Sequence, residues 1–229
     1  MKKIKINMLS NADKIDGQGV GSAYLEQVSL IRDELNDYFD VVINENCPVD
    51  IIHCHTILPE YLIKMKRNKG VNVAYVHFLP DTLDGSIRLP KHAFQFFKKY
   101  VTHFYNTADY LIVVNPIFIN DLVKFGIEKK KIFYIPNYVS KDTFYKQHRD
   151  IIRHTKEKYS INPDNFIVLS VGQVQTRKGV KDFIEIAKKM PHMTFIWAGG
   201  FSFGKITDGY DELKEIYNNP PHNVKFIGI

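Results

Sequence analysis

Short apolar runs alternate with amphipathic stretches along the first part of the chain. The apolar runs have the length and the branched or aromatic residues of buried strands. They cover 4–9, 41–43, 50–55, 71–77, 110–114 and 132–135. Between them, apolar residues recur every three or four positions, which predicts helices. These helices cover 22–38, 59–69, 91–107 and 117–125. Strands that alternate with helices in this way predict a parallel α/β fold.

The pattern changes after Asn137. Residues 138–164 are polar and charged, with one short helix expected at 151–159, and we interpret this segment as the passage between two lobes. A second series then begins at Phe166, with strands expected at 166–171, 194–198 and 224–227. The sequence therefore predicts two α/β lobes, residues 1–145 and residues 146–229. The second has fewer strands than an independent doubly wound domain needs.

The turn between the strand at 166–171 and the next helix combines glycines with cations. Gly172 opens the turn, Arg177 and Lys178 stand side by side, and Gly179 precedes the helix. Free N–H groups and the dipole at a helix N-terminus attract anions, and two cations would add fixed positive charge. A diphosphate fits such a turn. An ordinary strand-to-helix turn with two solvated cations has the same residues, so both interpretations stay open.

The carboxyl ends of the predicted strands carry most of the unusual polar residues. In open α/β sheets, ligands bind just outside these ends. The residues expected there are Gly17, Gly19, Gly21, His53, His55, His77, Asn137, Arg177 and Lys178. Two lobes that face each other across such ends would form a cleft for a two-part substrate.

Two of these groups have competing interpretations. Gly17-x-Gly19-x-Gly21 is similar to a dinucleotide fingerprint, but Ser22 breaks its spacing and it begins too far from the preceding strand. NAD binding, and with it an oxidoreductase, is therefore disfavoured against close approach to a substrate or a plain loop. His53-x-His55 lacks a suitably spaced third metal ligand, so a structural or substrate-contact role is favoured. For His77 the structural and catalytic roles stay open.

Composition limits the partners of the chain. The net charge is +6 over 229 residues, which suits an anionic partner. No recognised nucleic-acid-binding module is present. There are only two cysteines, no signal-peptide core and no apolar run long enough to span a bilayer. We therefore expect a cytosolic protein that is soluble or peripheral to a membrane.

Two predicted helices are strongly basic, and the second interleaves its cations with phenylalanine and tyrosine. Such a surface can lie on an anionic bilayer, although charge runs are usually just solvated faces. The candidate membrane-contact residues are Lys64, Lys66, Arg67, Lys69, Lys91, Lys98 and Lys99.

Several segments together resemble the retaining glycosyltransferases of family 4, which have the two-lobed GT-B fold. They are Ala108–Asn115 with Ile135–Val139, Val171-Gly172-Gln173-x4-Lys178-Gly179, Phe195–Gly200 and Val224–Gly228. Within that family, the stretches VGQVQTRKGV, FIWAGG and VHFLPDT are most similar to bacterial diacylglycerol glucosyltransferases. The resemblance implies a complete N-terminal Rossmann-like, acceptor-side lobe at 1–145. Residues 146–229 would be a linker and a partial C-terminal lobe that binds the nucleotide sugar.

The resemblance also implies an activity. A hexose, glucose in the first instance, would pass with retention from a UDP-sugar to a membrane diacylglycerol lipid or a sugar acceptor, without metal or cofactor. Lys178, with Arg177, would hold the diphosphate and stabilise the departing nucleotide. His77 would lie near the transferred sugar. The other expected donor or acceptor contacts are Gly17, Gly19, Gly21, Asn137, Gly172, Gln173 and Gly200. The enzyme would work at the inner face of the cell membrane, held there by its basic segments.

Two departures from the family pattern matter. Gln173 stands where the family usually has arginine, so Arg177 is expected to supply that charge. The family's E-x7-E segment is absent and would follow Gly228. This predicts a fragment, a truncated product, or one half of a two-chain enzyme completed by a partner chain. The alternative is a non-catalytic subunit that binds an acceptor, a membrane or a partner.

Overall fold

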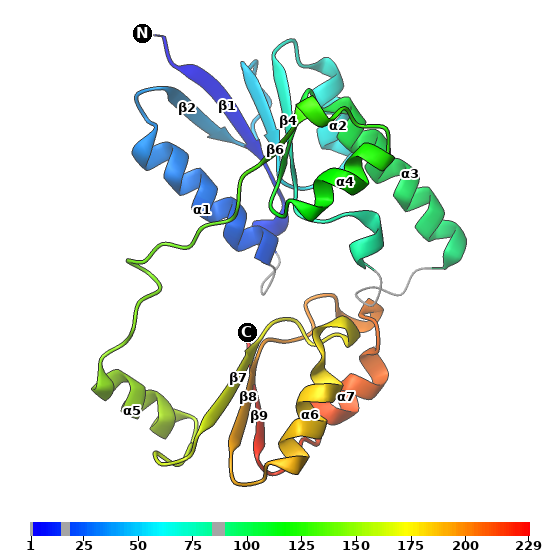
Figure 1. The fold of residues 1–229 in the computed structure, drawn as a ribbon. Coiled ribbons are helices and arrows are strands. Elements are labelled where there is room, and N and C mark those ends of the chain that lie inside the picture. The colour runs from blue at the N-terminus through cyan, green and yellow to red at the C-terminus, as the bar shows by residue number, and fades with distance from the viewer. Residues whose placement is uncertain (1, 15–18, 84–89) are drawn as a thin grey trace. The chain divides into compact units, whose positions relative to one another are not determined.

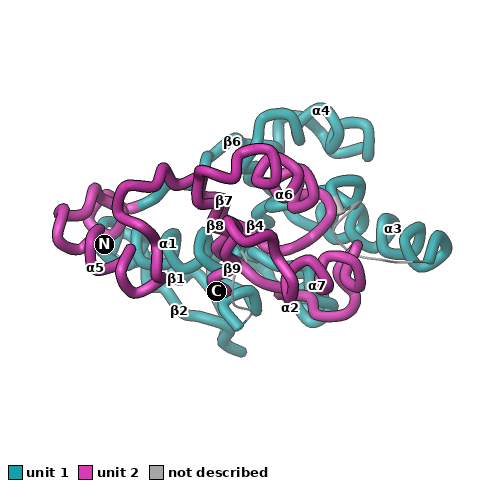
Figure 2. The backbone as a smooth tube through the Cα atoms, turned by 90° about the horizontal axis from the view of Figure 1, so that it is seen from below, with its two compact units in different colours: residues 1–83, 89–139 teal, residues 84–88, 140–229 magenta. Residues whose placement is uncertain are grey.

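The computed structural model describes residues 2–14, 19–83 and 90–229 (Figure 1). It divides into two compact units (Figure 2). Unit 1 comprises the described residues up to Leu83 and those from Pro90 to Val139, and unit 2 comprises residues 140–229. The boundary thus lies at 139/140, a few residues before the predicted position at 145/146.

Unit 1 is built on a six-stranded sheet with the strand order β2-β1-β3-β4-β5-β6. Every adjacent pair is parallel. The strands are β1 (Ile4–Leu9), β2 (Phe39–Ile43), β3 (Ile51–Cys54), β4 (Val71–Val76), β5 (Tyr110–Val113) and β6 (Ile132–Tyr134). The order reverses between β1 and β3, because the chain first moves outward to β2 and then returns past β1. Ligands of open α/β sheets bind at this kind of switch point.

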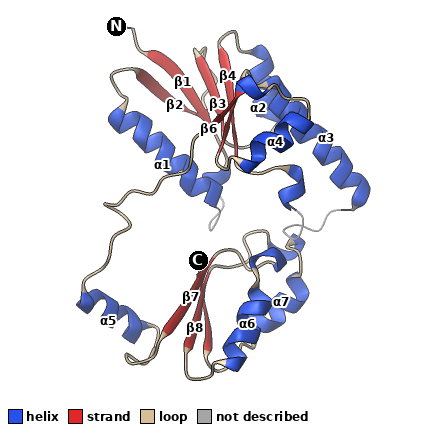
Figure 3. Cartoon of the chain, viewed as in Figure 1, coloured by secondary structure: helices blue, strands red, loops and turns tan. Residues whose placement is uncertain are grey.

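The helices of unit 1 cover the two faces of its sheet unequally (Figure 3). On one face Tyr24 and Val28 of α1 pack against Ile6 and Met8. The other face packs against the three later helices through a larger core. This division follows from right-handed crossovers, since only the β1-to-β2 connection runs in the opposite direction along the sheet. The helices are α1 (Gly19–Glu34), α2 (Pro59–Arg67), α3 (Lys91–Thr107) and α4 (Ile117–Lys124), and the short 3-10 helices are η1 (Ala12–Lys14), η2 (Pro80–Leu83) and η3 (Lys129–Lys131).

Helix α1 differs from its prediction at both ends. It begins at Gly19 rather than Ser22 and ends at Glu34 rather than Tyr38. The glycines favoured a loop because glycine is a weak helix former. Tertiary contact overrides that preference, since a Cβ at Gly21 would lie 2.6 Å from the carbonyl oxygen of Ala12. Only a residue without a side chain lets the first turn of α1 approach η1 so closely. The other predicted elements are confirmed, with small differences at their ends.

Unit 2 has a three-stranded parallel sheet of order β7-β8-β9. Its helices α6 and α7 pack on one face, where Phe183, Trp197 and Leu213 meet. On the other face, Leu169 is 61% and Val171 is 71% exposed. The elements are α5 (Arg149–Lys158), β7 (Ile167–Val171), η4 (Thr176–Lys178), α6 (Val180–Lys189), β8 (Thr194–Ala198), η5 (Gly204–Ile206), α7 (Tyr210–Asn218) and β9 (Val224–Gly228).

Within the described ranges, none of the helices combines the length and the apolar character that crossing a bilayer requires.

Candidate functional site

The turn after β7 combines two glycines of positive φ with two neighbouring cations. Gly172 has φ +147° and Gly179 has φ +73°, and Gly179 is the residue from which α6 begins. Arg177 and Lys178 lie in η4 between these glycines, and both are exposed. A Cβ at Gly172 would be 3.7 Å from Cδ and Cε of Lys178 and 3.9 Å from its Nζ. The lysine side chain therefore extends back over the start of the turn, at the carboxyl end of β7.

Trp197 fixes the start of this turn, a role that the sequence did not reveal. Its Nε1–H donates to the carbonyl oxygen of Gly172 at 2.8 Å. The Gly172 N–H in turn donates to the Ala198 carbonyl oxygen at 2.9 Å. A Cβ at Gly199 would lie 1.9 Å from the Gly172 oxygen, so β8 and the turn can approach this closely only with glycine at 199. The buried indole ring of β8 thus links the core of unit 2 to the turn after β7.

The remaining predicted residues of this turn have different environments. Gly200 is buried, and its carbonyl oxygen accepts from the Val174 N–H at 2.9 Å, so it holds the turn against the chain after β8. Gln173 is half-buried. Gln175, which the sequence did not single out, is fully buried, and neither atom of its side-chain amide has a partner among the described atoms. Direct ligand contact by Gly172, Gln173 or Gly200 stays a prediction.

In unit 1, three histidines gather near the point where the strand order reverses. His53 and His55 lie on the same side of β3 and its end. Tyr75 and His77 lie on the same side of β4 and its end, two residues further along the register, in which His53 pairs with Val73. The rings of His55 and Tyr75 stack with centroids 5.0 Å apart, and those of Tyr75 and His77 are 4.7 Å apart. Nδ1 of His55 is 3.3 Å from Nε2 of His77. Tyr24 of α1 meets the His55 ring edge-on at 5.0 Å.

Burial keeps these histidines neutral. His53 and His55 are 4% and 3% exposed, whereas His77 is half-buried. Desolvation lowers the pKa of His53 to about 3 and that of His77 to about 4. The pKa of His55 falls well below its usual value for the same reason, with a further contribution from the two neighbouring histidines. At neutral pH, His77 therefore offers a hydrogen bond and not a positive charge.

The other residues predicted for unit 1 are more dispersed. Gly19 begins α1 with open space around its Cα, and Gly21 is tightly packed against η1. Asn137 is exposed after β6. Gly17 lies outside the described residues. Ligand contact by these residues also stays a prediction. In the described ranges, no three His, Cys, Asp or Glu side chains converge to hold a metal ion.

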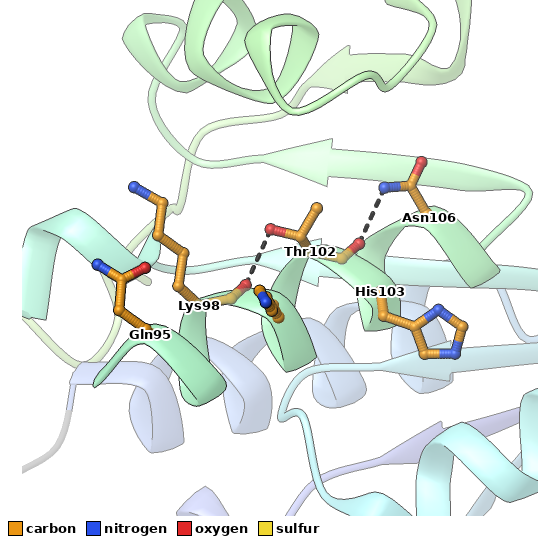
Figure 4. A pocket seen from close by; sticks show the side chains of 6 residues that line it. Gln95, Lys98, Thr102, His103 and Asn106 are labelled. Carbon is orange, nitrogen blue, oxygen red and sulfur yellow. Dashed lines mark hydrogen bonds between the residues drawn. The ribbon is translucent and has the colours of Figure 1, made fainter. Parts of the chain in front are cut away.

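Helices α2 and α3 present the basic residues on adjacent surfaces. Lys66 Nζ lies 3.1 Å from Nε2 of His103, which joins the two helices. A hollow of about 610 Å³ runs along α3 (Figure 4). Lys98 is held by Asp81 at 2.9 Å, while the side chain of Phe96 is 75% exposed. The residues that line the hollow are Gln95, Lys98, Lys99, Thr102, His103 and Asn106. Among the other predicted cations, Arg67, Lys69 and Lys91 are exposed and Lys64 is half-buried.

These features define a class of protein. The fold is that of GT-B glycosyltransferases, as represented by the Anabaena protein Alr3699/HepE, solved in complex with UDP-glucose. That structure matches with a TM-score of 0.71 and 18% identity, over 99% of this chain and 69% of its own. The Glycosyltransferase Family 4 model matches residues 34–143. The resemblance seen in the sequence is thereby confirmed.

Two named relatives match along most of the chain. The alpha-galactosylglucosyldiacylglycerol synthase of Streptococcus pneumoniae (strain ATCC BAA-255 / R6) is 46% identical over 232 aligned residues, which cover 100% of this chain. The processive diacylglycerol alpha-glucosyltransferase of Acholeplasma laidlawii is 26% identical over 90% of this chain. The chain spans 62% of the length of the first relative, and the match to the second spans 60% of that protein.

Proposed function

We propose that this chain acts as a glycosyltransferase that moves a hexose from a UDP-sugar to a glycerolipid acceptor, with retention at the anomeric carbon. The observation that carries the proposal is the 46% identity, along the whole chain, to a protein named as a glycolipid synthase. The Acholeplasma laidlawii relative is also named for transfer to diacylglycerol. Glucose is the proposed hexose, and galactose is the competitor to be tested beside it.

The turn after β7 supports the proposed binding of the UDP-sugar, which is the donor substrate. Lys178 extends over Gly172, and Arg177 adds a second cation in the same short helix. When the bond from the sugar to the diphosphate breaks, negative charge grows on the departing nucleotide. Cations that are already in place stabilise that charge more in the transition state than in the ground state, which is what accelerates the reaction. The two residues would do this without a metal ion.

The histidine cluster of unit 1 supports the proposed binding of the transferred sugar. His77 is half-buried at the end of β4 and is neutral because burial lowers its pKa to about 4. A neutral imidazole can exchange a hydrogen bond with a sugar hydroxyl without placing a positive charge beside an oxocarbenium-like centre, where a cation would be unfavourable. We propose that His77 binds the transferred sugar in this way.

The α2–α3 surface supports a membrane-bound acceptor. Lys66 and Lys99 supply exposed positive charge, and Phe96 supplies an exposed aromatic ring. A basic face with an apolar side chain is the combination that lies in the interface of an anionic bilayer. We propose that this surface holds the protein at the inner face of the cell membrane, where it would meet diacylglycerol.

A transfer assay with paired donors and acceptors tests the proposal. Radiolabelled UDP-glucose or UDP-galactose is incubated with anionic vesicles that contain diacylglycerol or glucosyldiacylglycerol. The chain is used alone and also completed with the part of the Streptococcus pneumoniae relative outside the matched region. We expect label in the lipid extract for at least one pair. If neither form labels lipid from any pair, the enzymatic proposal is wrong and a non-catalytic binding subunit replaces it.

A further inference from the structure

The contact between His55 and His77 determines which nitrogen of His77 carries its proton. Nδ1 of His55 lies 3.3 Å from Nε2 of His77. Burial keeps both rings neutral, so each ring carries one proton and one of the two facing nitrogens donates to the other. Two arrangements satisfy this contact. Either His55 donates from Nδ1, or His77 donates from Nε2 and His55 keeps its proton on its own Nε2.

The environment of the far nitrogen of His55 distinguishes the two arrangements. Nε2 of His55 is buried and has no hydrogen-bond partner among the described atoms. A proton there would be a buried N–H donor without an acceptor, which folded proteins avoid more strongly than an under-satisfied acceptor. The burial of His55 therefore favours its Nδ1–H form.

We propose that His55 is a positioning residue that donates its Nδ1–H to Nε2 of His77 and so fixes His77 in the Nδ1–H form. Nδ1 of His77 is then the nitrogen that remains available to a ligand. It is a hydrogen-bond donor and suits a hydroxyl or carbonyl oxygen. The use of this donor on a sugar rests on the proposed function, but the protonation state itself does not.

Ring stacking gives the arrangement its rigidity. The ring of Tyr75 lies against both histidines, with an angle of 12° to His55 and 26° to His77. The Tyr75 hydroxyl donates to the Ile135 carbonyl oxygen at 3.1 Å, which holds that ring in place. Tyr24 also contacts the His55 ring edge-on, and its own hydroxyl donates to the Met8 carbonyl oxygen at 3.2 Å. His55 thus has a fixed orientation from which to direct its proton.

Nitrogen-15 NMR of the imidazole rings tests this directly and needs no substrate. Long-range proton–nitrogen spectra are recorded on the labelled chain at pH 7.5, with the signals of His77 identified by their loss in His77→Gln. We expect His77 to show a protonated Nδ1 and a bare Nε2. A protonated Nε2 on His77 in the unmodified chain overturns the proposal, and that spectrum decides the question even if a variant fails to fold.

Three variants separate positioning from simple packing. His55→Phe keeps a ring but removes the donor, so His77 is expected to shift toward the Nε2–H form. His55→Asn retains a side-chain N–H and is expected to restore the Nδ1–H form. His53→Phe is the matched control, because His53 shares the cluster and the burial but, among the described residues, makes no hydrogen bond to His77. Equal changes in the His77 spectrum for His55→Phe and His53→Phe would contradict the proposal.

Discussion

A single substitution at Lys178 tests whether the turn after β7 binds the diphosphate of the UDP-sugar. Lys178→Ala removes the cation that extends over Gly172. A charged hydrogen bond is worth about 1.5–3 kcal/mol, so we expect UDP to bind roughly 10–100-fold more weakly. Lys181→Ala is the matched control, because Lys181 lies in the neighbouring helix α6 and is paired with Glu212 at 2.5 Å. Isothermal titration calorimetry measures both. Equal affinities for the two variants would contradict the assignment of Lys178.

The buried histidines predict a loss of stability in mild acid. The pKa of His53 is about 3 in the folded chain and 6.5 in the unfolded reference, so the folded state resists protonation. The stabilisation is complete above pH 6.5 and falls below it, by about 1.4 kcal/mol per pH unit for each such histidine. His53→Phe should reduce the slope of unfolding free energy between pH 6.5 and 4.5, measured in urea. His192→Phe, which removes a histidine from an exposed site, is the control variant. Identical slopes for the unmodified chain and His53→Phe would refute this.

Single residues were predictable where their chemistry is visible in the sequence and not where it depends on neighbours. Arg177 and Lys178 stand together beside glycines, and the structure places them in an exposed turn as the sequence indicated, while anion binding there stays a prediction. The partnership of His55 with His77 requires the parallel pairing of β3 and β4. Its sequence signal is the two-residue spacing of ring-bearing side chains on consecutive strands. The contact of Trp197 with Gly172 left no such signal, because it joins β8 to a turn.

At the scale of elements, the first turn of α1 contains a matched pair of glycines. Gly21→Ala would place a Cβ 2.6 Å from the Ala12 oxygen, and the shift of α1 or η1 should cost about 1–3 kcal/mol. Gly19→Ala meets nothing within 4 Å and should be neutral or stabilise by up to about 1 kcal/mol, since alanine is the better helix former. Urea unfolding compares the two. A Gly21→Ala chain as stable as the unmodified one would show that α1 does not depend on this contact.

The α2–α3 surface predicts binding to anionic vesicles that weakens with salt. Each basic residue near such a surface contributes about 1 kcal/mol, so Lys66→Ala with Lys99→Ala should reduce partitioning roughly 30-fold. Lys158→Ala with Lys189→Ala removes the same charge from exposed positions in unit 2. Co-sedimentation with vesicles at low and moderate salt provides the measurement. If both double variants lose binding equally, net charge and not this surface is responsible.

Helices and strands were predictable because the period of their apolar residues differs. The apolar runs at 110–114 and 194–198 predicted buried strands, and both strands are confirmed. The start of α1 was wrong because local propensity opposed tertiary packing at Gly21. The basic character of α3 was also visible, but the sequence did not show that Phe96 is exposed while Phe104 of the same helix is buried, because that depends on what packs against each turn.

For the whole molecule, the alternation of elements predicted two α/β units, and the motifs predicted the GT-B class. The strand order of unit 1, with its reversal between β1 and β3, could not be read from periodicity, because every parallel order gives the same pattern along the chain. The family motifs supplied what periodicity lacked. Identity of 46% to a glycolipid synthase extends over the entire chain, so both units contribute to the likeness.

The transfer of glucose to lipid is the measurement that tests this account most directly. The chain completed with the remaining part of the Streptococcus pneumoniae relative is incubated with radiolabelled UDP-glucose and anionic vesicles that contain diacylglycerol. Labelled glycolipid and free UDP are then quantified from the same samples. We predict that they appear in equal amounts, because each transfer forms one glycosidic bond and releases one UDP. UDP-glucose left intact, or hydrolysed without labelled lipid, would contradict the transfer of glucose to diacylglycerol.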